Sequence, residues 1–507
     1  MEERETAFEE VLGEWLAYYG PVELETLRAL FGAEAREIED AVQALAESES
    51  VVVGRITEGG PDREVCDARN LEYLLRTKRT KRRAGFSALD PDSLPLFLAT
   101  WQGLAARGRS PESLKRALEK LFGYPLPVEL WEEEVFPARL DGYSTSWLDT
   151  LLRGSDLIWF GCGRSKAGFC FRDELPLFSE ARALEDEGRA AFLPAMSVRP
   201  GAQNKSDSAG TLLPHPGGKY GFREILETAG LPPDELNKIL WDRAWKGELF
   251  NDGWEGVRRG IQSGFRMGEP EGPRAARGRG AGWSSTIQAG GSWFRQEREG
   301  QGLDPIGQEE RVKDRVRQLL ERYGVLFRQL LERELPALRW QNVFRTLRVM
   351  ELGGEAVGGQ FFARIPGIQF ASPRAHGMFL NGIWGSPTFW MNACDPASLC
   401  GAGIEGLRGR LPARLPSTHL VYHGKELVLV SKRRGKELEF FIGPEDPRVG
   451  GCLALFRSLL ERSYNPLGRV RVETINGETA VTSAHSATLL AWGFQMSYRG
   501  LVLERAF

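Results

Sequence analysis

The sequence predicts an α+β protein built of tandem winged-helix domains, with a C-terminal β-rich barrel module and a small α/β lobe. Two observations predict this fold. A pattern of helices, a hinge, a short apolar strand and a hairpin occurs four times before residue 386, and it is typical of a helix-turn-helix with a wing. After residue 386 the sequence changes to short apolar strands with tight Gly turns. The length of 507 residues also favours several domains, because single cores rarely grow beyond about 250–300 residues.

The repeated pattern first occurs at residues 8–56, where apolar positions recur every three or four residues before the strand-like VVVGRI. In each copy a Gly or Ser followed by an acidic residue separates the helix from the strand. One copy would mean little, because a helix, a Gly and a strand are common in mixed folds, but four copies favour winged helices. The later copies are WLDTLLRGSDLIWFG at 147–161, LNKILWDRAWKGELFND at 236–252 and NVFRTLRVMELGGEAVGGQFFARI at 342–365.

The copies and the breaks between them divide the chain into domains. A linker is expected where the apolar content is low and no period is sustained. The strands HLVYH, ELVLVS and ELEFFI, with turns at Gly424 and Gly435, predict the β-rich module. The expected division is a winged helix with a basic helix extension at 1–86, winged-helix-like domains at 87–198 and 199–260, a Gly/Arg-rich linker at 261–310, a fourth winged helix at 311–385 and the β-rich module with its α/β lobe at 386–507.

The composition is that of a globular protein, with 42% apolar and 27% charged residues. The net charge of −3 argues against attraction of nucleic acid by the whole surface, so binding must depend on local patches. Apolar runs are much shorter than the roughly 18 residues of a membrane span, and the charged N-terminus is unlike a signal sequence. We therefore expect a cytoplasmic protein without membrane contact. The six cysteines show no CxxC spacing, which predicts reduced thiols, no metal site and no cofactor.

The strongest local charge follows the apolar string LEYLL, where six of eight residues are cations. On a helix these side chains would neutralise several phosphates of a nucleic acid. The alternatives are a solvated helix end, whose dipole favours cations, and pairing with the acidic run Glu132-Glu133-Glu134. The residues expected to bind phosphate are Arg76, Lys78, Arg79, Lys81, Arg82 and Arg83.

Three further groups are candidates for nucleic-acid contact. Arg274, Arg277 and Arg279, with Trp283 and Trp293 nearby, would form a flexible arm with stacking groups, or serve merely as a spacer. Trp101, followed by Gln102, would stack on a displaced base, although a Trp at a helix end is more often core packing. The third group is Lys432, Arg433 and Arg434, which lie at a hairpin turn and are equally well explained as a solvated tip.

Eight strings with a consistent order are spread over nearly the whole chain. They are PLFLATWQGL, EEVFPARLDGYSTSWLDTLL, LWDRAWKGELFNDG, ERYGVLFRQLLERE, GIQFASP, NACDPASL, RLPSTHLVYHGKEL and RVETINGETA. Together these strings resemble the C-terminal region of bacterial large helicase-related (Lhr) proteins. The resemblance implies tandem winged helices with a β-barrel module, preceded in that family by an ATP-dependent helicase core. It also implies similarity to winged-helix DNA glycosylases and an association with DNA repair and uracil removal.

Two kinds of catalytic motif are missing from their expected places. A P-loop needs GxxxxGK[ST], and the nearest string, Pro216-Gly217-Gly218-Lys219, is followed by Tyr220. Any translocation would therefore need a motor outside this sequence. The related glycosylases place a Gln-x-Asp or Gln-x-Gln string where this chain has the apolar Gly123 to Pro127. Weak catalytic candidates that remain are Asp141, Asp395, Gln102 and Gln369, with Glu473 as a further acid.

Three functional hypotheses follow from the sequence. The first is a DNA-binding and assembly module of the Lhr type without the ATPase motor. The second is a DNA glycosylase that removes uracil or a damaged base, and the third is a winged-helix oligomerisation scaffold. The expected partners are single- or double-stranded DNA, an Lhr-type helicase core on the same or another chain, and a second copy of this chain.

Overall fold

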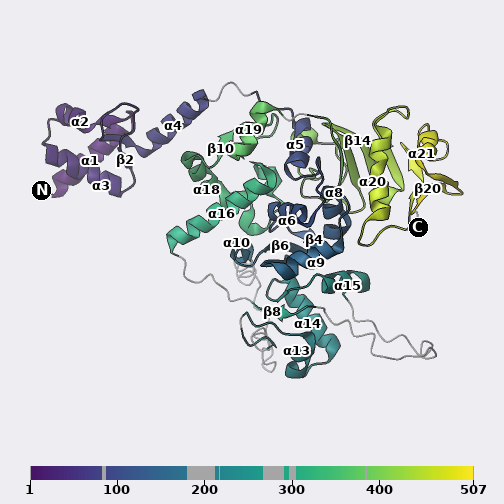
Figure 1. Cartoon of the computed structure of the whole chain (residues 1–507). Helices are drawn as coiled ribbons and strands as arrows, with labels where there is room; N and C mark the ends of the chain where they lie inside the picture. The colour runs from purple at the N-terminus through teal and green to yellow at the C-terminus, as the bar shows by residue number, and fades with distance from the viewer. Residues whose placement is uncertain are drawn as a thin grey trace, which may run out of the picture. The chain divides into compact units, whose positions relative to one another are not determined.

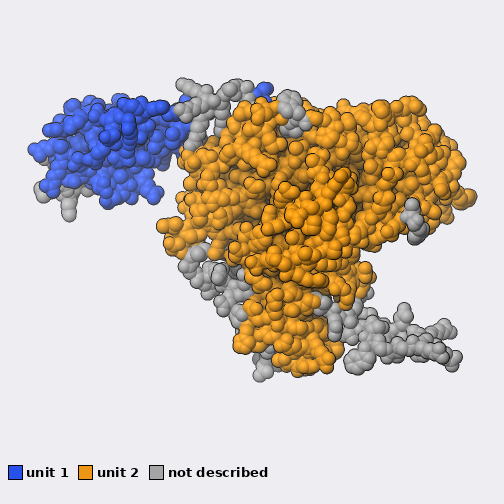
Figure 2. Space-filling view, in the orientation of Figure 1, with its two compact units in different colours: residues 1–87 blue, residues 88–507 orange. Residues whose placement is uncertain are grey.

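The computed structural model describes residues 2–82, 87–179, 212–215, 217–265, 291–295, 304–382 and 385–505. The chain forms two compact units, residues 1–87 and 88–507 (Figure 2). Both units mix helices with short strands, which confirms the α+β class. None of the helices in the described ranges has the length and apolar composition needed to cross a membrane.

Unit 1 is a winged helix followed by one more helix. Its three short strands pair antiparallel in the order β1-β3-β2, so the last strand lies in the centre of the sheet. Helix α3 buries Ile38, Ala41 and Val42, which recur at the spacing of one helix face. The elements are α1 (Glu2–Leu16), β1 (Val22–Glu23), α2 (Leu24–Phe31), α3 (Ala35–Glu47), β2 (Val51–Gly54), β3 (Glu64–Asp67) and α4 (Ala68–Arg82).

In unit 2 the second winged helix has the same strand order, β4-β6-β5, with the last strand in the centre. Its second helix is interrupted by a π-helix, Trp131–Val135. Helix α5 (Leu94–Trp101) comes before this domain and α10 (Leu175–Ser179) after it. The elements are α6 (Pro111–Lys120), β4 (Leu126–Pro127), α7 (Val128–Leu130), α8 (Phe136–Arg139), α9 (Thr145–Gly154), β5 (Leu157–Gly161) and β6 (Lys166–Phe171).

The third winged helix extends into the expected linker. Strand β8 (Trp293–Phe294) pairs with β7 (Phe250–Asn251), and Tyr220 bridges to Trp293 on its other side. Trp293 is fully buried and meets Trp241 edge to face, so it is a core residue and not a stacking group of a flexible arm. The helices are α13 (Phe222–Ala229), α14 (Pro233–Trp245) and α15 (Glu255–Ser263), the last of which lies between the two strands in sequence.

The fourth winged helix again has its last strand in the centre, in the order β10-β11-β9. Its first helix begins at Pro305, inside the segment expected to be a linker, with Asp304 accepting a hydrogen bond from the N–H of Gly307 as a cap. The elements are α16 (Pro305–Tyr323), β9 (Val325–Leu326), α17 (Arg328–Leu331), α18 (Trp340–Gly353), β10 (Val357–Gly359), β11 (Gln369–Ala371) and α19 (Pro373–Asn381).

The C-terminal module is the yellow-green part of the chain around β14, α20 and β20 in Figure 1. It contains a six-stranded sheet in the order β12-β13-β14-β15-β17-β18 and a three-stranded sheet in the order β16-β20-β19. Within residues 385–505 the end strands β12 and β18 are not paired with each other, so the sheet is open and the predicted barrel is not confirmed. The strands are β12 (Thr388–Asn392), β13 (His419–His423), β14 (Glu426–Lys432), β15 (Glu437–Phe440), β16 (Arg469–Val472), β17 (Thr474–Ile475), β18 (Glu478–Thr479), β19 (Gln495–Ser497) and β20 (Gly500–Glu504). The helices are α20 (Val449–Glu461), which contacts β12 and β13, and α21 (Ser486–Trp492).

Candidate nucleic-acid interface

One side chain closes the wing in both the first and the fourth winged helix. Glu64 begins β3, and its Oε2 accepts hydrogen bonds from the N–H groups eight and seven residues before it, at 2.9 and 2.6 Å. Gln369 begins β11, and its Oε1 accepts from the N–H groups at the same two offsets, at 3.0 and 2.9 Å. Gln369 is fully buried and holds the wing together, so it does not present its amide to a base.

Two other proposed catalytic residues meet inside unit 2 at an arginine that the sequence did not single out. Arg139 donates to both carboxylate oxygens of Asp395, at 2.7 and 2.8 Å, and to Oε1 of Gln102 at 2.8 Å. The amide of Gln102 donates in turn to the carbonyl of Arg322 at 3.0 Å. All three side chains of this cluster are buried, so they join distant segments and do not face solvent.

Trp101 also has a structural position. Its indole is 3% exposed and its Nε1–H donates to the carbonyl of Glu321 at 2.7 Å. The cations of Lys120 and Arg374 lie over the ring, 5.2 and 5.1 Å from its centre. The Trp101 ring is therefore not available to stack on a base, because it is buried and already has cationic neighbours.

The acidic run is buried as well. Glu132, Glu133 and Glu134 lie on the π-helix, each 5% exposed or less. Glu132 accepts hydrogen bonds from Arg258 on α15, whereas Glu134 accepts from His419 on β13 at 2.9 Å. The expectation that this run is available to pair with the basic helix is therefore wrong, because its partners are in unit 2.

The middle carboxylate of the run is the least compensated. Glu133 accepts a hydrogen bond from Asn465 at 2.7 Å and lies 3.4 Å from Arg462. Burial raises the pKa of the Glu133 carboxyl, and the Asn465 hydrogen bond and Arg462 act in the opposite direction. The π-helix thus connects the second winged helix, the third winged helix and the C-terminal module through buried polar contacts.

The surface candidates at the β14–β15 turn are largely neutralised. Lys432 pairs with Glu439, Arg433 pairs with Glu437 at 2.9 Å, and the neighbouring Lys436 pairs with Glu473 at 3.3 Å. Arg434 is exposed. Exposed pairs of this kind cancel much of the local field, so the turn offers less positive potential than its sequence indicates.

Asp141 is the one catalytic candidate with substantial exposure among the four. Its side chain is 45% exposed and pairs with Arg107 at 3.5 Å and Arg109 at 3.1 Å. Two arginines therefore flank this carboxylate at the surface. A carboxylate held in this way on the surface is typical of a structural ion pair.

The basic run begins on α4, which continues from β3 and ends at Arg82. Lys78 is exposed and lies 3.6 Å from Glu58. Several of the predicted nucleic-acid residues lie outside the described structure, either as whole residues or as side chains on α4. These are Arg83, Arg274, Arg277, Arg279 and Trp283 as whole residues, and Arg76, Arg79, Lys81 and Arg82 as side chains.

Helix α18 carries a surface that the sequence analysis missed. It is the third helix of the fourth winged helix, the position of the recognition helix in helix-turn-helix proteins. Its exposed residues recur at three- and four-residue spacing, which places them on one face. Phe344 is 37% and Val349 38% exposed. The exposed residues are Gln341, Asn342, Phe344, Arg345 and Val349.

The charge on the third helix differs between the fourth and the first winged helix. Helix α18 contains two arginines, Arg345 and Arg348, and one acid, Glu351, which is buried and lies 3.8 Å from Arg348. Helix α3 of unit 1 contains one arginine against four acids. Helix α14 packs on β5 through stacked tryptophans, including Trp241 on Trp159. Its face is therefore occupied by the neighbouring winged helix.

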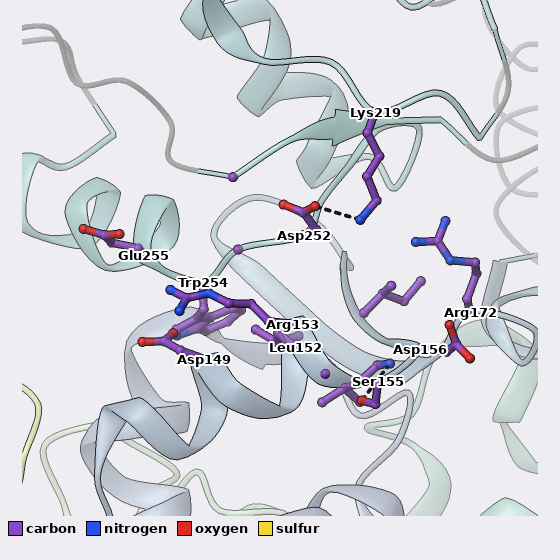
Figure 3. A pocket seen from close by; sticks show the side chains of 15 residues that line it. Asp149, Leu152, Arg153, Ser155, Asp156, Arg172, Lys219, Asp252, Trp254 and Glu255 are labelled. Atoms are coloured by element: carbon purple, nitrogen blue, oxygen red, sulfur yellow. Dashed lines mark hydrogen bonds and ion pairs between the residues drawn. The ribbon is translucent and has the colours of Figure 1, made fainter.

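A cavity of about 550 Å³ lies between the second and third winged helices (Figure 3). Its lining includes the apolar side chains of Leu152, Ile158 and Trp254. The Lys219 ammonium points toward Asp252, 3.0 Å away. The other charged lining residues carry both signs, so the cavity has no strong preference for anions or cations. They are Arg153, Arg172, Asp149, Asp156 and Glu255.

No group of three His, Cys, Asp or Glu side chains in the described ranges is placed to hold a metal ion. All six cysteines are free thiols. Cys170 is buried, and this burial raises the pKa of its thiol well above the ordinary value.

Comparison with known proteins confirms the resemblance found in the sequence. Residues 89–174 and 306–379 match two family models described as large helicase-related protein, winged-helix domain. The Lhr helicase/probable uracil glycosylase of Mycolicibacterium smegmatis is 24% identical over 98% of this chain and 34% of its own length. The Lhr helicase/uracil glycosylase of Escherichia coli is 26% identical over 57% of this chain and 19% of its own length. The chain thus spans about a third or less of these relatives.

A solved structure also aligns with the chain. The DNA glycosylase AlkZ of Streptomyces sahachiroi aligns over 76% of this chain and 100% of that chain, with a TM-score of 0.45 and 13% sequence identity.

Proposed function

We propose that this chain, which contains two winged-helix domains of the large helicase-related type, is a DNA-binding and assembly module. The observation that carries the proposal is the outer face of α18. This face combines the exposed Arg345, the exposed amides of Gln341 and Asn342, and two half-exposed apolar side chains at the position of a recognition helix. The Asn342 amide also donates to the carbonyl of Pro336 at 2.7 Å, so its oxygen and second N–H are the groups left for DNA. Amides of Gln and Asn hydrogen-bond to base edges, and arginines bind guanine or phosphate.

The N-terminal end of α18 adds to this surface. Arg339 precedes the helix and is exposed. The free N–H groups and the dipole of a helix N-terminus favour a phosphate. Gln341 and Asn342 follow in the first turn. We therefore expect the first half of α18 to contact a DNA duplex, with Arg345 one turn further along.

The assembly role is supported by the buried polar clusters of unit 2. The Arg139 cluster joins residues 37 and 256 positions apart in sequence. The π-helix carboxylates have partners on α15 and β13. Buried ion pairs are weak evidence for stability, but they favour one arrangement of the elements because every other arrangement leaves charges unpaired. We infer that unit 2 holds its winged helices in one fixed arrangement for DNA.

Further parts of the interface are proposed on the sequence alone. The cations of α4 and the Arg-rich segment around Arg274, Arg277 and Arg279 supply phosphate contacts that do not depend on base sequence. A helicase core, on the same chain or another, is the partner that would use such a module. The acidic face of α3 supports a role in protein contact for the first winged helix, which keeps a second copy of the chain among the partners.

Uracil or damaged-base excision is the second candidate function, since the names of two relatives include uracil glycosylase. Against it, Asp395, Gln102 and Gln369 are buried and Asp141 is held by two arginines. A glycosylase needs an accessible carboxylate or amide that orients water or stabilises positive charge on the sugar. We therefore rank binding above excision.

The test of the proposed function is duplex binding by the full chain, measured by fluorescence anisotropy over a range of salt concentrations. Arg345→Ala is expected to weaken binding and to reduce the log–log salt slope by about 0.9, the value for one lost phosphate contact. The matched control is Arg36→Ala on α3, an arginine whose side chain is 91% exposed. Equal affinity and equal slope for wild type and Arg345→Ala would contradict the proposal.

A further inference from the structure

Two arginines from distant segments meet on the loop that follows β12. Arg333 lies after α17 in the fourth winged helix, and Arg414 lies before β13 in the C-terminal module. Nη1 of Arg333 donates to the carbonyl of Ser398 at 2.6 Å, and Nη1 of Arg414 lies 3.5 Å from the same oxygen. Because they share this carbonyl, the guanidinium groups of this arginine pair lie side by side.

The hydrogen-bond partners of the arginine pair among the described residues are neutral backbone carbonyls and one hydroxyl. Arg333 also donates to the carbonyl of Cys400. Arg414 donates to the carbonyl of Cys394 at 2.7 Å and to the Tyr124 hydroxyl at 2.8 Å. Such partners stabilise a cation but do not cancel its charge, and a guanidinium stays protonated in a protein. The pair therefore brings two positive charges to this junction.

The carboxylates beside the arginine pair already have other arginine partners. Asp395, on the same loop, binds Arg139 through both carboxylate oxygens, at 2.7 and 2.8 Å. Glu334, which follows the first arginine of the pair in sequence, accepts a hydrogen bond from Arg322. Each of these carboxylates balances one buried arginine. The arginine pair itself forms no ion pair with any residue that the structure describes.

Three neighbouring groups that could carry a negative charge stay neutral. Burial raises the pKa of the Tyr124 hydroxyl and of the Cys394 and Cys400 thiols. Burial and the neighbouring Arg414 lower the pKa of the Arg333 guanidinium, as expected for like charges that are close together and partly removed from water. A partly buried charge is costly unless it is paired, so the pair favours an anion from outside.

The arginine pair is open to such an anion. Both residues are partly exposed, and the Nε–H of neither has an acceptor among the described residues. A guanidinium presents its N–H groups as a planar fork that matches the oxygens of a phosphate. Charge-assisted hydrogen bonds of this kind are about twice as strong as neutral ones. The chemistry of the pair therefore fits a phosphate group.

We propose that Arg333 and Arg414 form a phosphate-binding site that takes a backbone phosphate of DNA. The proposal rests on the proposed function, and it adds to the face of α18 a second contact, at the junction with the C-terminal module. A polyanion is the favoured source of the phosphate, because α18 and Arg333 belong to the same winged helix and a duplex held by α18 brings many phosphates to this domain. The contact contributes affinity that does not depend on base sequence.

The test is the salt dependence of duplex binding by the full chain. Arg333→Gln combined with Arg414→Gln removes both charges but keeps side chains that can donate to the loop carbonyls. We expect the log–log salt slope to become shallower by about 0.9, the value for one lost phosphate contact. The double Lys variant keeps both charges and should keep the slope. Arg410→Gln is the matched control, because Arg410 is already paired with Asp92 at 2.6 Å.

Two further measurements accompany the slopes. Unfolding curves show whether each variant folds. Hydrogen exchange of wild type needs no substitution, and the duplex should slow exchange in the peptides spanning residues 401–418, which contain Arg414. Inorganic phosphate, compared with chloride at equal ionic strength, tests the same peptides for binding of a free anion.

Equal slopes for wild type and the double Gln variant would overturn the inference, as would exchange at 401–418 that the duplex leaves unchanged. Slower exchange with inorganic phosphate but not with the duplex would overturn it too, because it would assign the arginine pair to a free anion. If Arg345→Ala changes the slope and the double Gln variant does not, the inference fails and the proposed function stands. Unchanged slopes in both would refute both.

Discussion

Arg139 and Asp395 form a deeply buried ion pair, with side chains 1% and 0% exposed. Removing one partner of a buried pair leaves the other charge without compensation, which typically costs about 3–5 kcal/mol. We predict a loss of this size in the free energy of unfolding for Asp395→Ala. Urea unfolding of the full chain, followed by tryptophan fluorescence, measures it.

The matched control is Asp92→Ala, which removes an ion pair with Arg410 on the surface, where the side chains are 34% and 59% exposed. Exposed pairs contribute about 1 kcal/mol or less. A loss for Asp395→Ala no larger than that for Asp92→Ala would show that the buried cluster does not hold the elements together.

Base excision is predicted to be weak or absent. The proposed acids and amides are buried or held in ion pairs, and loss of a general acid or base typically costs a factor of about a hundred to ten thousand in rate. The measurement is single-turnover incubation with uracil-containing and alkylated strands, followed by alkaline cleavage at abasic sites. Robust cleavage above a heat-killed control would contradict the prediction and direct attention to Asp156 and Asp252 of the cavity.

At the residue scale, the sequence singled out polar residues as catalytic candidates, but it did not reveal which residues surround them. Gln102 and Asp395 were proposed as catalytic residues, whereas they are joined through Arg139, which lies 37 and 256 residues away from them. No local pattern encodes such a distance. Glu64 and Gln369 each accept a hydrogen bond from the N–H group eight residues earlier in the sequence. This match could have predicted the role of Gln369, but it is recognised only when both hydrogen-bonding patterns are known.

At the scale of elements, the two wings use different chemistry for the same contact. The Thr57 hydroxyl and backbone N–H groups lower the pKa of Glu64. A carboxyl with a lowered folded-state pKa contributes stability above its unfolded value, about 4.5, and this contribution is lost as the pH falls through the folded-state pKa. The wing of the fourth winged helix, closed by an amide, has no such dependence.

We predict that Glu64→Gln keeps the first wing closed but removes this pH dependence, because a Gln oxygen makes the same two contacts in the fourth winged helix. Hydrogen exchange of the β2–β3 peptides in the full chain, compared between pH 7 and pH values below 4.5, measures local stability. Wild type and Glu64→Gln should differ most at pH 7 and converge at low pH.

The reverse change is the control. In Gln369→Glu a carboxylate oxygen would replace the amide nitrogen that donates to the carbonyl of Phe362 at 2.8 Å. Two acceptors would then face each other in a buried site, so this variant should be destabilised at pH 7. An unchanged pH dependence in Glu64→Gln would contradict the account of the wing.

The helices and strands of the winged helices could be predicted because their sequence pattern is repeated along the chain. Four copies of the pattern indicated winged helices, and the central position of the last strand agrees with that fold in each sheet. The linker was drawn too long because β8 has two residues, which is too short for a period to be recognised. Closure of a barrel depends on pairing between end strands, and sequence patterns say little about such distant pairing.

At the scale of the whole molecule, a net charge of −3 conceals an uneven distribution. Acids are concentrated on α1, on α3 and in the buried run of the π-helix, whereas α4 ends in a run of cations and α18 carries two arginines. Binding of nucleic acid should therefore be local and electrostatic despite the negative total.

The salt dependence of DNA binding by the full chain tests this account most directly. The account predicts that the logarithm of the affinity falls linearly with the logarithm of salt concentration, with a slope of about −0.9 for each duplex phosphate contacted, and that Arg345→Ala makes the slope shallower. A slope near zero, or a slope that Arg345→Ala leaves unchanged, would contradict the claim that this is a DNA-binding module acting through α18.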